Sequence, residues 1–315
     1  MRMSSHVARR GAHQRFAAFC VCAATALVVG ACTGKAADTT AKETSPWTLT
    51  WSDEFDGPTL DSTHWALEAG NGFWNADSSA RVGGWGNEEL QCYTTSANNV
   101  QLRDGALSLV AQREQVRDVS SRDSTATCAF TSARLKTRAH DGRALFAQQY
   151  GRVVFRARLP EGQGLWPALW MLPLRDTYGT WAASGEIDVM EARGQNPTVV
   201  LGTLHYGAQW PKNVYSGMDY TLPRGGRISE WHEYAVEWTP RRMAWSVDDS
   251  VYQVQTKWYS GSDSTKRDSA TAPFDQPFYL VMNLAVGGRF LGSPDSTTRF
   301  PARMDVDWVR VYARR

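Results

Sequence analysis

Apolar and polar residues alternate along most of this chain, and that alternation predicts β-strands. In 152–159, Val153, Phe155, Ala157 and Leu159 can face one way while three arginines face the other. Further strands are expected at 106–111, 234–238, 243–247, 251–254, 278–286 and 306–312. No long segment has helical periodicity, so the pattern predicts an all-β fold, an antiparallel sandwich or barrel.

The strand pattern continues through residues 46–315 without an internal repeat or a break in composition. Asp248-Asp249 separates two alternating segments and predicts a hairpin turn, whereas 278–286 is apolar throughout, as in a strand buried on both faces. We therefore expect a single domain over 47–315, which is large for one β domain but permitted.

The N-terminus has the layout of an export signal. Residues 2–15 are basic and 16–31 are apolar, which predicts a signal peptide over 1–31. The residues 29–32 resemble the lipobox of bacterial lipoproteins, which implies cleavage before Cys32 and lipid on its sulfur. The alternative is an ordinary signal peptide cut near Ala31. Residues 32–46 are mostly small, polar and charged, which suits a flexible tether.

We therefore expect an exported protein, an outer-membrane lipoprotein that faces the periplasm or the cell surface, or otherwise a secreted one. The lipid anchor would be its only membrane contact, because no other apolar run reaches the length of a membrane span. In an oxidising compartment Cys92 and Cys128 are expected to form a disulfide, and the alternative is two separate buried thiols.

Composition narrows the classes of function. The chain is 42% hydrophobic and 21% charged, as folded globular proteins are. Its formal charge of +2 includes four arginines of the signal segment. Without them the remainder is slightly acidic, which argues against a nucleic-acid binder. The 14 tryptophans indicate a Trp-rich core or stacking platforms for flat ligands.

The segment 185–191 carries the candidate chemistry. In a strand, Glu186 and Asp188 share one face, and Ile187 and Val189 share the other. Strict alternation would turn Glu191 away from the two acids. A β-bulge near 189–190 would return it to their face, so that three carboxyl groups lie together.

Clustered carboxyl groups raise one another's pKa, so that some protons remain at neutral pH. Cleavage of a glycosidic bond by the retaining mechanism needs this mixture, with one carboxylate to attack the anomeric carbon and one acid to protonate the leaving oxygen. The alternatives are a solvated strand edge or ligands for a hard cation. The interleaved apolar residues argue against an exposed edge, and no further acids cluster nearby.

The sequence Glu-Ile-Asp-Val-Met-Glu at 186–191 resembles the active-site signature of glycoside hydrolase family sixteen, in the form with one inserted residue that is typical of laminarinases. Other segments resemble the family in the same order, at 51–57, 85–91, 131–137, 166–171, 202–207, 283–288 and 304–312. The resemblance covers about 47–313. It implies a concanavalin A-like β-jelly-roll sandwich with a concave substrate cleft.

The resemblance also implies roles for individual residues. Glu186 would be the nucleophile, Glu191 the general acid/base, and Asp188 the assisting acid between them. Sugar platforms and hydroxyl-binding groups would be Trp85, Asn87, Arg134, Trp166, Trp170, His205 and Trp210. The alternatives are that Trp166 belongs to the core and that His205 is a strand residue satisfied by the backbone.

A structural calcium is implied as well, held by Glu54, the Gly105 carbonyl and Asp307, and the alternative is that both acids are ordinary surface residues. The sequence has no His/Cys cluster for zinc and no glycine-rich loop before a helix. We expect no cofactor for the chemistry and a monomeric protein.

The leading interpretation is a retaining endo-β-1,3-glucanase of the laminarin-cleaving type, whose partner is the polysaccharide substrate. A second keeps fold and mechanism but changes the polysaccharide to a mixed-linkage β-1,3-1,4-glucan or a galactan. A third is a non-catalytic glucan-binding surface lipoprotein on the same sandwich. The presence of all three acids, Glu186, Asp188 and Glu191, argues against the third.

Overall fold

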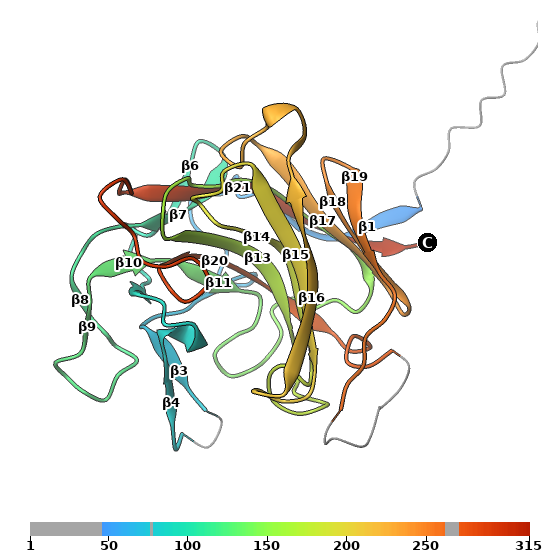
Figure 1. Ribbon diagram of the computed structural model, residues 1–315, viewed down its shortest axis with the longest axis horizontal. Helices are drawn as coiled ribbons and strands as arrows, with labels where there is room; N and C mark the ends of the chain where they lie inside the picture. Colours follow the sequence, from blue (N-terminus) through green and yellow to red (C-terminus); the bar gives the residue numbers. More distant parts are fainter. Residues whose placement is uncertain (1–45, 76–77, 262–270) are drawn as a thin grey trace, which may run out of the picture. The chain divides into compact units, whose positions relative to one another are not determined.

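The computed structural model describes residues 46–75, 78–261 and 271–315, and the regular secondary structure of these residues is almost entirely β-strand (Figure 1). The expected signal peptide, Cys32 and residues 32–45 of the expected tether lie outside the described residues. Within the described part of the chain, no helix has the length and apolar character needed to cross a membrane.

One layer is an eight-stranded antiparallel sheet. Its strands follow the order β19 (Ser250–Gln255), β18 (Arg242–Val247), β17 (His232–Thr239), β12 (Gly151–Arg158), β21 (Ala302–Arg314), β7 (Ala106–Ala111) and β6 (Val100–Arg103), and β1 (Trp47–Asp53) also pairs with β21. β21 is the last strand in the sequence, yet it is hydrogen-bonded to β12, to β7 and to β1.

The other layer is a seven-stranded antiparallel sheet. Its strands follow the order β16 (Asn213–Thr221), β15 (Val199–Gly207), β14 (Glu186–Ala192), β13 (Leu165–Pro173), β20 (Phe278–Val286), β11 (Arg134–Lys136) and β2 (Ala66–Leu67). The strand with the three acids, β14, therefore lies inside the sheet, between β13 and β15.

Short strand pairs and two single-turn helices make up the rest of the regular structure in the described residues. They are β3 (Gly72–Trp74) with β4 (Arg81–Gly83), β5 (Gln91–Tyr93) with β10 (Phe130–Ser132), β8 (Val116–Arg117) with β9 (Thr127–Cys128), η1 (Gly84–Gly86) and η2 (Pro223–Gly225). The β5–β10 pair is parallel, and the other two are antiparallel.

The hydrophobic core is formed by the side chains that the two sheets turn toward each other. Val153 and Phe155 of β12 belong to the same buried cluster as Ile187 and Val189 of β14, as the alternation predicted. Every residue of β20 is at most 6% exposed, which confirms the prediction of a strand buried on both faces. The fold is thus the antiparallel sandwich that the sequence predicted.

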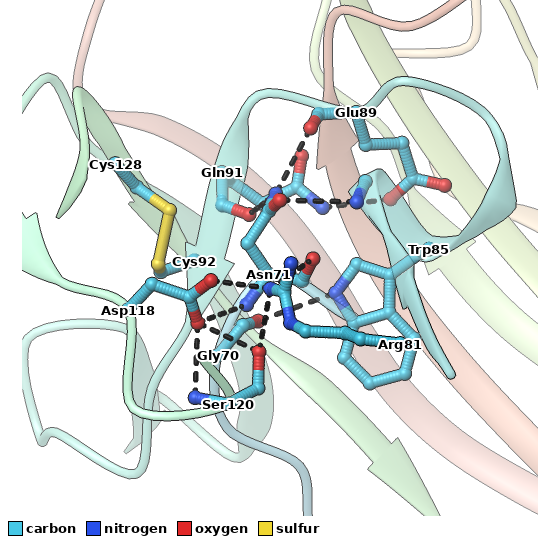
Figure 2. The surroundings of a disulfide bond; sticks show 11 residues. Gly70, Asn71, Arg81, Trp85, Glu89, Gln91, Cys92, Asp118, Ser120 and Cys128 are labelled. Carbon is cyan, nitrogen blue, oxygen red and sulfur yellow. Dashed lines mark hydrogen bonds and ion pairs between the residues drawn. A yellow bond between two sulfur atoms is a disulfide. The ribbon is translucent and has the colours of Figure 1, made fainter. Parts of the chain in front are cut away.

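The predicted hairpin lies between β18 and β19, where Asp248 and Asp249 both have positive φ angles of 48° and 62°. A two-residue hairpin turn whose twist matches that of the flanking strands requires positive φ at both central residues. Asp adopts positive φ more readily than most residues do. Elsewhere, Cys92 of β5 and Cys128 of β9 form a disulfide, with their Cα atoms 5.6 Å apart (Figure 2).

Candidate active site

A β-bulge in β14 sets the geometry of the site. Asp188 lies opposite Thr203 of β15, and Glu191 lies opposite Leu201, so two residues of β14 occupy the space opposite Gly202 alone. The pairing of β14 with β13 shifts at the same place. The extra residue reverses the alternation, and Glu191 returns to the face that carries Glu186 and Asp188.

The two faces of β14 have opposite characters. Ile187, Val189 and Met190 are at most 2% exposed and belong to the hydrophobic core. The acids face away from that cluster, but they are not freely solvated, because the side chains of Glu186 and Asp188 are only 13% and 4% exposed. This is the arrangement of acids that the bulge predicted.

A core side chain from the opposite sheet is hydrogen-bonded to the backbone next to the bulge. The Trp245 indole Nε1–H of β18 donates a 2.8 Å hydrogen bond to the Asp188 carbonyl oxygen, although β18 belongs to the opposite sheet. Trp245 can reach this carbonyl because position 202 is glycine. A Cβ atom at Gly202 would lie 2.3 Å from the Trp245 Cδ1 atom, closer than real Cβ atoms approach their neighbours.

Burial raises the pKa of all three carboxyl groups. It raises the pKa of Glu186 to about 7 and that of Glu191 to about 7. Burial also raises the pKa of Asp188 well above its ordinary value, and the neighbouring charges of Glu186 and Glu191 add to the effect. At neutral pH the cluster therefore retains protons, and Asp188 is the group that holds one most firmly.

Two indole rings donate hydrogen bonds to the outer two acids. Trp181 Nε1–H donates to Glu186 Oε2 at 2.9 Å, and Trp166 Nε1–H donates to Glu191 Oε1 at 3.0 Å. Each hydrogen bond favours the ionised form and lowers the pKa of its acceptor against the effect of burial. The indoles also fix which way each carboxyl group points.

His205 of β15 lies beside the acids. Its Nε2 atom is 3.7 Å from Glu186 Oε1 and 3.4 Å from Asp188 Oδ2. Burial lowers the pKa of His205, so at neutral pH the ring is neutral and leaves the acids without a full counter-charge. The ring stands between Trp181 and Tyr215, with centroid distances of 5.6 and 5.9 Å.

Arg134 of β11 has a position that the sequence did not predict. Its guanidinium carbon lies 4.4 Å from the centre of the Trp85 ring and 4.8 Å from that of Trp170, and its Nε is 2.6 Å from Glu68 Oε2. An arginine between two indoles is held by cation–π contacts on both sides. Arg134 was expected to bind sugar hydroxyls, and the structure adds a second task, that of spacing the two rings.

The other expected sugar-binding residues differ in their contacts and exposure. Trp170 Nε1–H donates to Asn283 Oδ1 at 2.7 Å, which leaves the face of its ring toward Arg134. Asn87 is exposed and donates to Glu89 Oε1 at 3.3 Å. Trp210 is 69% exposed, and its backbone N–H bonds to the Trp181 carbonyl.

The side chains of the expected calcium site are paired with arginines. Glu54 accepts two hydrogen bonds from Arg310, of 3.0 and 2.7 Å, and Asp307 is hydrogen-bonded to Arg156. Gly105 lies in the exposed turn between β6 and β7. Carboxylates already neutralised by arginine fit a cation poorly, so these residues do not fit calcium as they are arranged here, and the ion stays a prediction.

Among the described residues, one group of three His, Cys, Asp or Glu side chains is close enough to share a metal ion. It comprises Glu186, Asp188 and His205, whose ligand atoms lie within 4.8 Å of one another. These are the atoms that the chemistry of the site would itself use. The His205 Nδ1 atom also has no hydrogen-bond partner, whereas metal-binding histidines almost always use theirs.

Sequence reasoning missed Trp181, Glu68 and Glu89. Trp181 precedes the acidic strand by five residues in a loop, where alternation gives no information on side-chain direction. Its one signal was an isolated large aromatic residue among small ones, just before Glu186. Glu89 is buried and Glu68 is half-buried, and Arg134, which interacts with both, comes from a distant segment.

The sequence is similar to those of known proteins. The family model described as "Glycosyl hydrolases family 16" matches residues 87–310. The chain is 46% identical over 268 residues to a glucan endo-1,3-beta-glucosidase A1 of Niallia circulans, with 84% of this chain and 37% of that protein covered. It is 42% identical over 277 residues to a beta-glucanase of Rhodothermus marinus, and the match covers 84% of this chain and 85% of that protein.

Solved structures of known proteins also resemble the fold of this chain. The laminarinase catalytic domain from Thermotoga maritima superposes with a TM-score of 0.71 at 35% identity, and the match covers 85% of this chain and 99% of that one. The chain thus matches catalytic domains over almost their whole length, but it spans little more than a third of the longer Niallia circulans protein.

Proposed function

Because the chain belongs to family 16 of the glycosyl hydrolases, we propose that it is a retaining, endo-acting glycoside hydrolase that cleaves β-1,3-glucan of the laminarin type. Mixed-linkage β-1,3-1,4-glucan is the second substrate to be tested. The observation that carries the proposal is the bulge in β14, which gathers Glu186, Asp188 and Glu191 on the face of the sheet that points away from the core.

The first step divides the work between the outer acids. The ionised Glu186 attacks the anomeric carbon while Glu191 gives its proton to the departing glycosidic oxygen, and a glycosyl ester forms on Glu186. The hydrogen bond from Trp181 favours the ionised form of Glu186. The raised pKa of Glu191, about 7, keeps a proton available on it near neutral pH.

The second step reverses these roles. Glu191, now ionised, takes a proton from water as the water attacks the anomeric carbon, and Glu186 leaves as a carboxylate. Asp188 is a proton-holding neighbour throughout, because its own raised pKa keeps it neutral. Two displacements at one carbon return the sugar to its original β configuration, so the first product should be the β-anomer.

The substrate class is tested by reducing-sugar release from laminarin, lichenan and agarose, with linkage analysis of the products. Laminarin should be the best substrate and agarose should not be cleaved. Glu186→Gln should abolish turnover and retain laminarin binding. Glu237→Gln is the matched control, because Glu237 lies on β17 of the other sheet.

Three results would overturn parts of this proposal. Agarose as the sole substrate would reject the glucanase assignment, and binding of laminarin without any hydrolysis by the wild-type protein would favour the glucan-binding alternative. An α-anomer as the first product, seen by proton NMR, would reject the retaining mechanism.

We also propose that the protein is exported and anchored by lipid on Cys32, on the strength of the basic, apolar and lipobox-like segments before that residue. Several acyl chains on one cysteine hold a protein at a membrane far more firmly than one chain does. Mass spectrometry of the mature N-terminus tests this, and a Cys32→Ser variant should be released in soluble form. An unmodified N-terminus at or before residue 32 would reject the anchor.

A further inference from the structure

The loop between β13 and β14 carries Trp181, whose indole N–H lies 2.9 Å from Glu186 Oε2. The ring is 39% exposed, so burial alone does not hold it there. The loop is closed on itself by Ser184, whose hydroxyl accepts the Tyr178 backbone N–H at 2.9 Å and donates to the Gly179 carbonyl at 2.7 Å. The position of the indole therefore depends on how this closed loop is attached to the rest of the protein.

Gln276 attaches the loop at both of its ends. Its side chain is buried, and its Oε1 atom accepts a 2.6 Å hydrogen bond from the Thr177 hydroxyl. Its Nε2 atom donates to the Ser184 carbonyl at 3.1 Å and to the Pro273 carbonyl at 3.3 Å. Thr177 and Ser184 lie on either side of Trp181 in the sequence. One amide group, with its acceptor and its donors in use, thus holds both ends of the segment that carries the indole.

The segment that carries Gln276 is itself fixed to the core. Phe274 is fully buried, and its carbonyl accepts a 3.1 Å hydrogen bond from the indole N–H of Trp238. The Phe274 ring also packs against Gly185, where an added Cβ atom would lie 2.8 Å from it. Gln276 therefore joins a close-packed part of the core to a loop that is partly exposed.

Three further hydrogen bonds attach the loop to other segments of the chain. They join Tyr178 to Asp275 at 2.6 Å, Ser260 to Ala183 at 2.6 Å, and Trp210 to Trp181 at 3.0 Å. None of these bonds involves Gln276, so they would remain in a variant without its amide. Loss of the amide should therefore loosen the loop without releasing it, and the indole should spend part of its time away from Glu186.

We propose that Gln276 is a positioning residue for the nucleophile, because it holds Thr177 and Ser184 and so keeps the Trp181 indole N–H on the Glu186 carboxylate. The proposal rests on the proposed function for the role of Glu186. It assigns Gln276 no contact with substrate, and the described hydrogen bonds of Gln276 go to none of the catalytic acids. Its effect is carried by the loop and the indole.

The test uses two variants and a control. Gln276→Met keeps the length of the side chain and removes its hydrogen bonds. Thr177→Val keeps the shape of the side chain and removes only the hydroxyl that donates to Gln276. Thr180→Val is the matched control, because Thr180 is an exposed threonine of the same loop whose hydroxyl makes no hydrogen bond to another described residue. Thermal unfolding checks that each variant is folded.

The first measurement does not depend on activity. In protein that contains ¹⁵N-labelled tryptophan, the indole cross-peak that Trp181→Phe lacks belongs to Trp181. Because this N–H donates to Glu186, the peak should move downfield as the pH rises through the pKa of Glu186, which burial raises to about 7. In Gln276→Met this displacement should fall about twofold, as expected when the bond is formed half of the time. It should fall less in Thr177→Val, and Thr180→Val should match the wild type.

The second measurement is the pH profile of kcat/KM on laminarin, whose acid limb reports the ionisation of Glu186 in the free enzyme. A weaker hydrogen bond from Trp181 raises the pKa of Glu186. Gln276→Met should therefore move the acid limb up by about half a pH unit, or about threefold in kcat/KM on the acid side, and leave the alkaline limb in place. Adding Gln276→Met to Trp181→Phe should move the acid limb little further, because both changes act on one hydrogen bond.

An unchanged Trp181 peak in folded Gln276→Met protein would overturn the proposal. An equal loss of kcat/KM at every pH would also reject it, since a merely structural role gives that result. Full additivity with Trp181→Phe would mean that Gln276 acts on Glu186 by another route, and would reject it too. If Gln276→Met does not fold, Thr177→Val decides by the same criteria. Failure of the proposed function is a separate result, because the wild type would then release no sugar from laminarin while the Trp181 peak still responds to Gln276→Met.

Discussion

The hydrogen bond from Trp181 to Glu186 makes a sharp prediction about pH dependence. Replacing Trp181 by Phe removes the indole N–H that lies 2.9 Å from Glu186 Oε2 and keeps an aromatic ring in place. This N–H stabilises the ionised carboxylate and lowers its pKa. Without it the pKa of Glu186 rises further above its usual value, so a higher pH is needed to ionise the nucleophile.

The size of the shift follows from the strength of the bond. A hydrogen bond to a charged group contributes about 1.5–3 kcal/mol, and 1.36 kcal/mol corresponds to one pKa unit. Trp181 is 39% exposed, so water can partly replace the lost donor and the lower figure applies. The acid limb of the kcat/KM profile should therefore move up by about one pH unit.

Trp166→Phe is the matched variant. It removes the N–H that lies 3.0 Å from Glu191 Oε1, so the pKa of Glu191 should rise. Because Glu191 must be protonated to act as the acid, this variant should extend the alkaline limb upward and leave the acid limb in place. Reducing-sugar release from laminarin between about pH 4 and about pH 9 gives both limbs.

The assignment fails if Trp181→Phe moves the alkaline limb and Trp166→Phe the acid limb, because the two acids would then have exchanged roles. It also fails if both variants lose activity equally at every pH. In that case the indoles would only shape the site and would not tune the acids.

Three further predictions concern single features. Glu191→Gln should lower kcat/KM on laminarin about 10²–10⁴-fold, but lower kcat/KM far less on an aryl glycoside, because the leaving group of that substrate needs no proton in the first step. Gly202→Ala should lower the free energy of unfolding by about 1–3 kcal/mol in denaturant titrations, because the new Cβ would collide with Trp245. The Cys92→Ser/Cys128→Ser variant should lose about 3–4 kcal/mol in the same assay, since its cysteines are 36 residues apart.

The sequence predicted those features that depend on local periodicity. Alternation identified strand residues whose side chains face the core, such as Val153 and Ile187. The break in alternation before Glu191 predicted the bulge. Both follow from the two-residue repeat of a strand, which is a property of the chain itself.

Features that depend on loops or on distant partners could not be predicted in this way. Trp181 reaches Glu186 from a loop, where no repeat fixes the direction of a side chain. Arg134 meets Glu68 and Trp170 only because β2, β11 and β13 belong to one sheet, and it meets the Trp85 indole from η1, a distant segment of the sequence. Likewise, the arginine partners of Glu54 and Asp307 are far away in the sequence, at Arg310 and Arg156.

The place of β21 has a consequence for how the chain matures. Residues 302–314 form β21, which follows all the other described strands in the sequence. β1, β7 and β12 nevertheless all pair with β21. Trp47 and Arg314, which pair across β1 and β21, lie far apart in the sequence. Closure of this sheet therefore depends on contacts of long sequence separation, and a chain without 302–314 would leave β1, β7 and β12 without their shared partner.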